Sequence, residues 1–268
     1  MSRISRVFAE LKQQGRTALI PFITAGDPHP DQTVDMMHTL VAAGADIIEL
    51  GIPFSDPMAE GPVIQKASER ALQHGVSIHD VIDMVRRFRK QNEKTPVILM
   101  GYVNPIEVTG YEAFAKEAAG AGTDGVITVD MPPEEGVDYI GALKGEELDP
   151  IFLLAPTSAE QRMESVGEAS GGFVYYVSLR GVTGGGDPDL TEVADKIATI
   201  RRHVDLPVGV GFGINSPQTA ARMARLADAV IVGSAVVKRV EAHGDNPQKM
   251  HSELTEFISS LRQALDEQ

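Results

Sequence analysis

The sequence predicts an α/β protein, a single (β/α)8 barrel with an extra N-terminal helix. Short apolar segments rich in β-branched residues alternate with amphipathic segments along the chain. There are eight such apolar segments; the first begins at residue 18 and the eighth at 228, so one begins about every 30 residues, the size of a βα unit. The chain has 268 residues, close to the ~250 usual for a closed parallel barrel. We expect one domain spanning 1–268.

The N-terminal segment precedes the first predicted strand. Ile4, Val7, Phe8 and Leu11 follow the i, i+3, i+4, i+7 spacing of one helix face. The segment lacks the apolar region and cleavage site of a secretory signal, so we predict a structural helix and a cytoplasmic protein.

The eight predicted strands are almost continuously apolar, which is typical of a parallel sheet covered on both faces. They span residues 18–24, 46–52, 96–102, 124–130, 149–155, 172–178, 206–212 and 228–234. Amphipathic helices are predicted over 34–44, 78–91, 111–120, 191–204 and 219–227, with a long final helix near 246–266. An open doubly wound sheet is the alternative, but no GxGxxG follows the first strand.

Composition narrows the function classes. With 38 acidic and 24 basic residues the net charge is −14, which argues against non-specific nucleic-acid binding. No apolar run approaches the ~20 residues of a membrane span. The absence of cysteine excludes disulfides, zinc–thiolate sites and iron–sulfur clusters. We therefore expect neither nucleic acid nor membrane as a partner.

Catalytic groups of such barrels lie at the C-terminal ends of the strands. Glu49 interrupts the apolar segment 46–52, where a carboxylate costs several kcal/mol unless it is neutral, paired or used. We predict that it is a general acid/base. The alternative is a structural carboxylate that is hydrogen-bonded at the barrel rim.

Glycine-rich loops follow the seventh and eighth strands. Gly213 precedes a helix, and Gly233 and Ser234 open another. Because helix N-termini present free N–H groups, these loops predict a phosphate site, with ordinary tight turns as the alternative. The loop 179–189 contains four glycines and is predicted to be a lid, with a disordered surface loop as the alternative.

Other catalytic chemistries lack their groups at the predicted strand ends. No lysine ends a strand, so a Schiff-base mechanism lacks its amine, and no histidines cluster with metal-ligand spacing. The sequence thus predicts carboxylate acid/base chemistry on a phosphorylated small molecule, without a metal. Phe22, Tyr102 and Tyr175 are candidates for an apolar pocket beside it.

Several motifs resemble one family. The segments ELGIPFSDPMAEGPVIQ (49–65), LMGYVNP (99–105), PIFLLAPTS (150–158), SLRGVTG (178–184) and GVGFGI (209–214) are similar to the tryptophan synthase alpha chain, and the resemblance runs from about residue 3 to the final helix. It implies a lyase of tryptophan biosynthesis that cleaves indole-3-glycerol phosphate by a retro-aldol reaction to indole and glyceraldehyde 3-phosphate, with no metal or organic cofactor of its own.

The resemblance also implies site residues. Glu49 is expected to shuttle protons, and Glu60, which stands where the family usually has Asp, to bind the indole N–H. Thr183 is expected to orient Glu49, and Tyr175 to support it. The implied indole pocket comprises Phe22, Met100, Tyr102, Ile127, Val129, Leu153 and Phe212. Ile127 and Val129 could equally be plain barrel packing. The implied phosphate site comprises Gly184, Gly213, Gly233 and Ser234.

A partner is implied as well. By resemblance the chain docks on a beta chain in an α2β2 heterotetramer, and that beta chain carries pyridoxal phosphate and receives indole through a tunnel. The implied docking residues lie in loops after the second, third and fourth strands: Pro53, Asp56, Pro57, Asn104, Pro105, Pro132 and Pro133. Two alternatives remain, a phosphate-binding barrel enzyme of the sugar-phosphate isomerase type and a non-catalytic regulatory alpha-like subunit.

Overall fold

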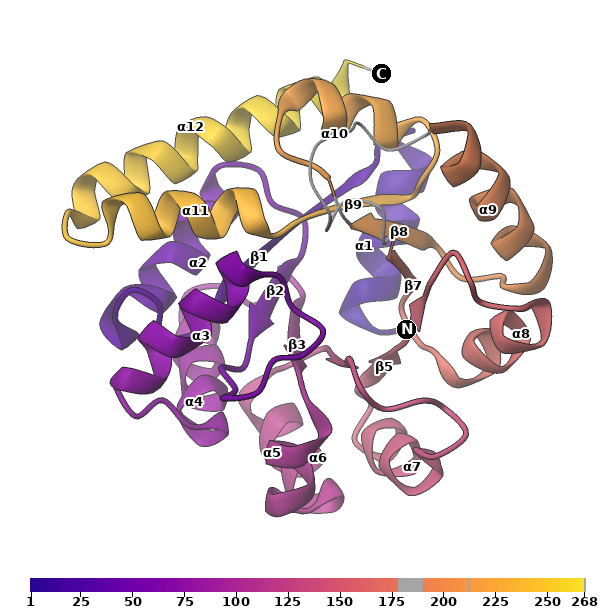
Figure 1. Cartoon of the computed structure of the whole chain (residues 1–268), viewed down its shortest axis with the longest axis horizontal. Coiled ribbons are helices and arrows are strands. Elements are labelled where there is room, and N and C mark those ends of the chain that lie inside the picture. Colours follow the sequence, from indigo (N-terminus) through magenta and orange to yellow (C-terminus); the bar gives the residue numbers. More distant parts are fainter. Residues whose placement is uncertain (178–189, 212, 268) are drawn as a thin grey trace.

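The strands form a parallel sheet that closes on itself inside a ring of helices, as a computed structural model of the chain shows (Figure 1). The structure describes residues 1–177, 190–211 and 213–267. Within them the strands are β1 (Ala18–Thr24), β2 (Ile48–Gly51), β3 (Val97–Gly101), β4 (Gly125–Thr128), β5 (Asp149–Ile151), β6 (Leu153–Leu154), β7 (Val174–Val177), β8 (Val208–Gly211) and β9 (Ala229–Val232). Their order in the sheet is β5-β4-β3-β2-β1-β9-β8-β7-β6.

The predicted fifth strand, 149–155, is divided into two pieces. β5 pairs with β4, β6 pairs with β7, and only Phe152 separates β5 from β6. β5 and β6, the first and last strands in the sheet order, are therefore consecutive in the chain, and the backbone at Phe152 links the two edges of the sheet. The barrel has the eight predicted strand positions, with the fifth shared between two short strands, so the (β/α)8 TIM-barrel prediction is confirmed.

Every predicted helix is present. They are α1 (Arg3–Gln13), α2 (Thr33–Ala42), α4 (Ile78–Arg89), α6 (Tyr111–Ala121), α9 (Leu190–His203), α10 (Pro217–Ala224) and α12 (Pro247–Asp266). The structure adds a 3-10 turn, η1 (Pro30–Gln32), and the helices α3 (Pro62–Gln73), α5 (Val103–Thr109), α7 (Val137–Gly145), α8 (Glu160–Ala169) and α11 (Ser234–His243). Of these, only the start of α11 was predicted. None of the helices in the described residues is long and apolar enough to cross a membrane.

Strand alternation divides the core into two parts. In β1, Leu19 and Ile23 point outward and pack in the layer between strands and helices. Ala18 and Ile20 point inward and join a separate cluster inside the barrel. Continuing this inward series, Phe22 and Thr24 reach the C-terminal end of the strand, where the barrel opens.

Helix α1 closes the opposite end of the barrel. Its buried residues Ile4, Phe8 and Leu11 belong to the same apolar cluster as the inward side chains of the strands, and the Phe8 and Phe173 rings lie 5.6 Å apart between centroids. The helix lies across the centre of the barrel, behind the strands in the view of Figure 1. The loops at the other end are thereby left to form the site.

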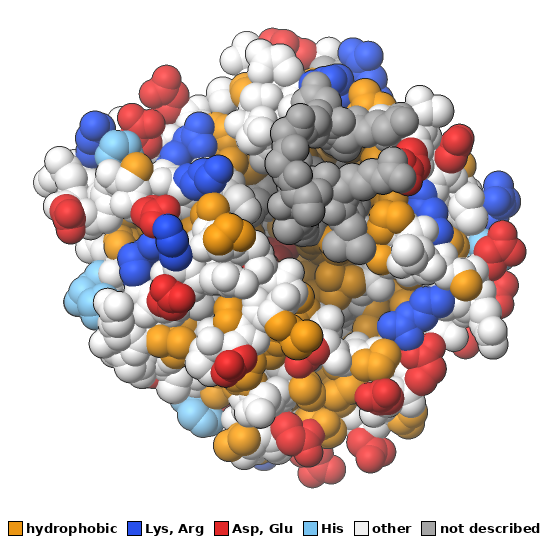
Figure 2. All heavy atoms as spheres, viewed as in Figure 1, with side chains coloured by type: hydrophobic (Ala, Val, Ile, Leu, Met, Phe, Trp, Pro, Cys, Tyr) orange, Lys and Arg blue, Asp and Glu red, His pale blue; other side chains and the backbone are white. Residues whose placement is uncertain are grey.

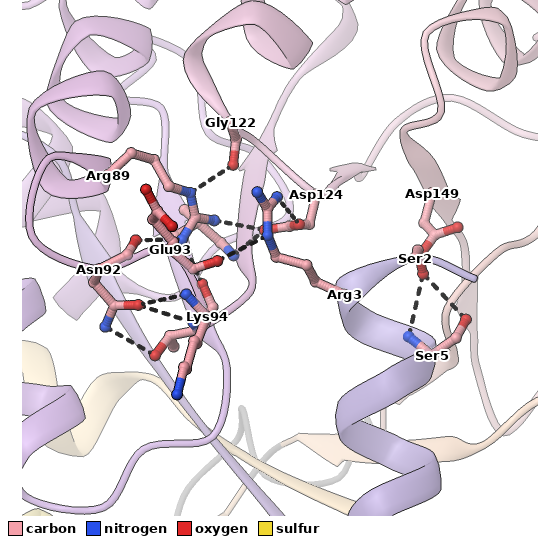
Figure 3. A network of polar contacts seen from close by, with 12 residues as sticks. Ser2, Arg3, Ser5, Arg89, Asn92, Glu93, Lys94, Gly122, Asp124 and Asp149 are labelled. Atoms are coloured by element: carbon pink, nitrogen blue, oxygen red, sulfur yellow. Dashed lines mark hydrogen bonds and ion pairs between the residues drawn. The ribbon is translucent and has the colours of Figure 1, made fainter.

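Polar contacts fix this helix to the starts of β4 and β5 (Figure 3). The Ser2 hydroxyl donates to Asp149 Oδ2 at 2.5 Å. Arg3 Nη1 donates to Asp124 Oδ1 at 2.8 Å, and Arg89 Nη2 donates to Asp124 Oδ2 at 2.6 Å. One buried carboxylate therefore joins α1, α4 and the sheet.

Candidate active site

Glu49 lies inside the barrel, on the inward face of β2. Its neighbours in register are Phe22 on β1 and Ile98 on β3. The side chain is 1% exposed, and its Oε2 atom has no hydrogen-bond partner among the described residues. Burial raises the pKa of Glu49 to about 8, and the nearby charge of Glu60 adds to the rise. Burial therefore favours the protonated form of this carboxyl group.

Glu60 lies on the loop that joins β2 to α3. Its N–H donates to the carbonyl oxygen of Pro57 at 3.0 Å, and its own carbonyl oxygen accepts from Gln65 Nε2 at 2.9 Å. Burial raises the pKa of the Glu60 carboxyl to about 7. Two carboxyl groups with raised pKa values thus lie near each other in this part of the barrel, a pattern found at acid/base sites.

Tyr102 holds this loop in place. Its hydroxyl oxygen accepts from the Ala59 N–H at 3.0 Å, and the Phe54 ring stacks on its ring with centroids 5.1 Å apart. Since Ala59 directly precedes Glu60, these contacts fix the backbone that carries the second carboxyl group.

Tyr175 reaches the two carboxyl groups from the other side of the barrel. It points inward from β7, and burial together with the charges of Glu49 and Glu60 raises its pKa well above the ordinary value. The ring lies against Gly211, where an added Cβ would stand 2.2 Å from the Tyr175 hydroxyl. Glycine at this position on β8 therefore makes room for the tyrosine.

The remaining predicted pocket residues fall into two groups. Phe22, Met100 and Tyr102 line a pocket together with Glu60. Ile127 belongs to the apolar cluster inside the barrel, against which Leu153 and Val129 pack. Figure 2 shows this end of the molecule, where hydrophobic side chains gather around a central hollow.

Sequence reasoning missed several residues that line this pocket. They are Thr24, Gly51, Ile52, Phe54, Ile64, Ser68 and Gly101, together with Pro57, which was expected as a docking residue and not in the pocket. The period-two alternation of β1 places residue 24 on the same face as Phe22, so this signal was available for Thr24. No pattern in the sequence indicated Ile64 and Ser68, because α3 was not predicted.

The predicted phosphate residues lie on neighbouring elements. Gly213 follows β8 with φ of +72°, and Gly233 and Ser234 follow β9, which pairs with β8. In the part of the chain that the structure describes, no side chain caps the start of α11, whereas Ser216 caps α10. The first N–H groups of α11 therefore lack the side-chain acceptor that α10 has. Thr183, Gly184, Phe212 and the predicted lid 179–189 lie outside the described residues.

Among the described residues, no group of three or more His, Asp or Glu side chains is arranged to hold a metal ion. A family model described as "Tryptophan synthase alpha chain" matches residues 8–266. The chain belongs to the tryptophan synthase alpha chain family. It is thus related to lyases of tryptophan biosynthesis that cleave indole-3-glycerol phosphate, and the comparisons favour neither alternative function.

Individual relatives agree with this membership. The tryptophan synthase alpha chain of Thioalkalivibrio sulfidiphilus is 58% identical over 266 residues, which cover 99% of this chain and 100% of the relative. That of Marinobacter nauticus is 56% identical, with 99% and 98% covered. The crystal structure of tryptophan synthase subunit alpha from Legionella pneumophila strain Paris superposes with a TM-score of 0.94 at 45% identity, and both chains are covered completely. The alpha-chain barrel is therefore this chain's fold.

Proposed function

We propose that this alpha-chain family member cleaves indole-3-glycerol phosphate with Glu49 as the proton shuttle and Glu60 as the acceptor for the indole N–H. One observation carries the proposal. Glu49 is fully buried beside a second carboxyl group, its Oε2 has no partner among the described residues, and its pKa is about 8. Such a group has a proton to donate, and within the described residues its Oε2 atom has no hydrogen bond to lose when it does so.

The reaction requires two proton transfers. Protonation of indole C3 makes the ring an electron sink, and the protonated Glu49 is the donor. Loss of the glycerol hydroxyl proton then lets the C–C bond break, and the Glu49 carboxylate formed in the first step is the base. The bonding electrons return to the ring, giving neutral indole and glyceraldehyde 3-phosphate, and Glu49 regains its proton.

Glu60 acts on the ring nitrogen. Positive charge develops on the protonated indole, and an ionised carboxylate at the N–H stabilises it more strongly in the transition state than in the ground state. The charge of Glu60 is one of the causes that raise the pKa of Glu49, so an ionised Glu60 favours a protonated Glu49. The two carboxyl groups are thereby suited to different roles.

Binding is proposed to use the apolar pocket and the loops after β8 and β9. Phe22, Met100 and Tyr102 line the pocket beside Glu60, which supports contact with the indole ring. The uncapped start of α11 supports backbone N–H donation to the phosphate from Gly233 and Ser234, with Gly213 beside them. Ile127, Leu153 and Tyr175 are proposed to form the inner wall of the pocket.

The partner belongs to the same proposal. We propose that the chain forms one domain, acts in the cytoplasm and docks on a beta chain in an α2β2 heterotetramer. Pyridoxal phosphate is proposed to reside on that beta chain. Asp56 and Met58, on the loop that carries Glu60, are exposed, and Met58 is 86% exposed although it is apolar. An exposed apolar side chain beside the site is suited to a protein partner.

Indole release from indole-3-glycerol phosphate tests the proposal, measured with and without added beta chain. Glu49→Gln is expected to lower kcat by about 10³-fold, because it removes the general acid/base and keeps the shape. Glu112→Gln, which changes an exposed glutamate on α6, is the matched control and should retain wild-type kcat. Near-wild-type turnover by Glu49→Gln would refute the mechanism, and unchanged turnover on adding beta chain would count against the docking proposal.

A further inference from the structure

Thr24 is a buried polar residue at the end of β1 that the mechanism above does not use. It is 3% exposed, and its Oγ1 atom has no hydrogen-bond partner within the described part of the chain. It pairs in register with Gly51 on β2. A buried hydroxyl without a partner costs about 1–3 kcal/mol. An unpartnered hydroxyl that lines a pocket has a physical explanation if it forms a hydrogen bond in another state of the protein, such as the substrate complex.

Glu60 is the complementary group in the same pocket. Thr24 and Glu60 both line it. A carboxylate only accepts hydrogen bonds, and among the described residues no side chain or N–H is found donating one to the Glu60 carboxylate. The Tyr102 hydroxyl accepts the Ala59 N–H, and among the described residues its O–H is not found donating to the Glu60 carboxylate. Within the described part of the chain, the pocket is therefore lined by a hydroxyl donor that lacks an acceptor and by a carboxylate that lacks a donor.

We propose that Thr24 is a positioning residue for the reaction: with substrate bound, its hydroxyl donates a hydrogen bond to the Glu60 carboxylate and holds that carboxylate against the indole N–H. The inference rests on the proposed role of Glu60. Glutamate has more rotatable bonds than aspartate, so its carboxylate loses more freedom when it is fixed at one place. A second hydrogen bond supplies that fixation from the rigid end of a strand.

Two substitutions at Thr24 separate the hydroxyl from the shape of the side chain. Thr24→Val replaces the hydroxyl by a methyl group, and Thr24→Ser keeps the hydroxyl. Thr24→Val is expected to lower kcat for indole release about tenfold, the size of one hydrogen bond to a charged group, with little change in KM. Thr24→Ser should stay within about twofold of wild type.

Stability provides the control for a merely structural role. Thr24→Val removes an unpaired buried hydroxyl, so its Tm should equal or exceed that of the wild type. A Tm that falls in Thr24→Val and is restored in Thr24→Ser would show that the hydroxyl has a structural partner in the free protein and would overturn the proposal.

The pH profile gives an independent reading. A hydrogen bond to the ionised form lowers a carboxyl pKa, so losing it moves the acidic limb of the kcat profile to higher pH. The kcat profile reports the enzyme–substrate complex, where the bond is proposed to form, and the kcat/KM profile of the free enzyme should not move. The titratable groups of the described residues that face Glu60, namely Glu49, Tyr102 and Tyr175, are the same in all variants.

A double-mutant cycle with Glu60→Gln completes the test. If Thr24 acts through Glu60, Thr24→Val should cost little in the Glu60→Gln background. The same tenfold loss in both backgrounds overturns the proposal. Wild-type turnover by Glu60→Gln overturns the role of Glu60 and the Thr24 proposal with it. A slow Glu60→Gln enzyme together with a full-rate Thr24→Val enzyme overturns the Thr24 proposal alone.

Discussion

The chemistry proposed for Glu49 depends on what surrounds a single side chain. Phe22 and Ile98 are its neighbours in register, and the described residues give its Oε2 no hydrogen bond. The same residue type at Glu112, on the surface of α6, is exposed to water. Whether a glutamate is a buried proton donor or a solvated charge thus depends on where it lies, inside the barrel on β2 or on the surface of α6.

The raised pKa of Glu49 also makes stability depend on pH. The folded-state pKa of about 8 lies above the ordinary value of 4.5, so the stabilising contribution is fully present below pH 4.5 and is lost as pH rises through 8. Glu49→Gln mimics the protonated form at every pH. We expect its Tm to lie within a few degrees of the wild type at pH 5 and to exceed it by about 10 °C at pH 9, because ionising the buried carboxyl group costs the wild type about 4 kcal/mol over that range. Thermal unfolding at both pH values measures this, and an equal difference at the two would contradict it.

Glu60 is longer by one methylene group than the aspartate that the resemblance described above implies at this position. Glu60→Asp keeps the carboxylate and shortens its reach by about 1.5 Å, a shift to which catalytic geometry is sensitive. Because Asp is the residue that the resemblance implies here and its carboxylate can still accept from the indole N–H, kcat is expected to stay within about tenfold of wild type or to rise. Steady-state indole release measures this. A collapse of activity would indicate that the pocket around Thr24 and Tyr102 is built for the longer side chain.

At the scale of elements, a glycine on β8 determines where a tyrosine from β7 lies. An alanine Cβ at Gly211 would stand 2.2 Å from the Tyr175 hydroxyl. Gly211→Ala is therefore expected to displace Tyr175, to lower the free energy of unfolding by about 1–3 kcal/mol and to reduce kcat/KM. Thermal unfolding and indole release measure the two effects.

A control for this prediction exists on α7. An added Cβ at Gly141 meets nothing within 4 Å, and its φ is not positive. Gly141→Ala should therefore stabilise the helix by about 0.5–1 kcal/mol and leave kcat unchanged. If the two substitutions had equal effects, the contact between Gly211 and Tyr175 would not be the cause.

Sequence reasoning succeeded for elements with strong periodicity. The stripe of Ile4, Phe8 and Leu11 became the buried face of α1. It failed where the periodic signal was short: α7 buries only Tyr139 and Leu143. The division of the fifth strand at Phe152 depends on pairing with two different neighbours, which no local pattern encodes. For the same reason Glu49 could be found from its sequence context, while the contact between Tyr175 and Gly211 could not.

At the scale of the whole molecule, the pairing of β1 with β9 brings the two ends of the sequence together. Glu49 on β2 and Glu60 on the loop that follows it are close in the sequence, whereas Tyr175 comes from the opposite side of the barrel more than a hundred residues later. The closed sheet, rather than any local motif, makes them neighbours.

The opposite end of the barrel is predicted to matter for stability alone. Asp124 accepts from both Arg3 and Arg89, with its side chain 3% exposed. Asp124→Asn leaves the largely buried Arg89 without its counter-charge and is expected to lower the free energy of unfolding by about 3 kcal/mol. Denaturant unfolding measures this, and kcat at 25 °C should not change. Asp83→Asn, which breaks an exposed pair with Arg86, is the control and should cost about 0–1 kcal/mol.

Helix α1, which fills the far end of the barrel, also determines from which side small molecules enter and leave the barrel. In the described part of the chain, Ile4, Phe8 and Leu11 occupy that end, so a molecule released beside Glu49 leaves past the loops by which its precursor entered. Arrival and departure then compete for one passage. A protein that covered those loops would control substrate entry and product release together. The rate of product formation would then depend on how readily each molecule passes that protein.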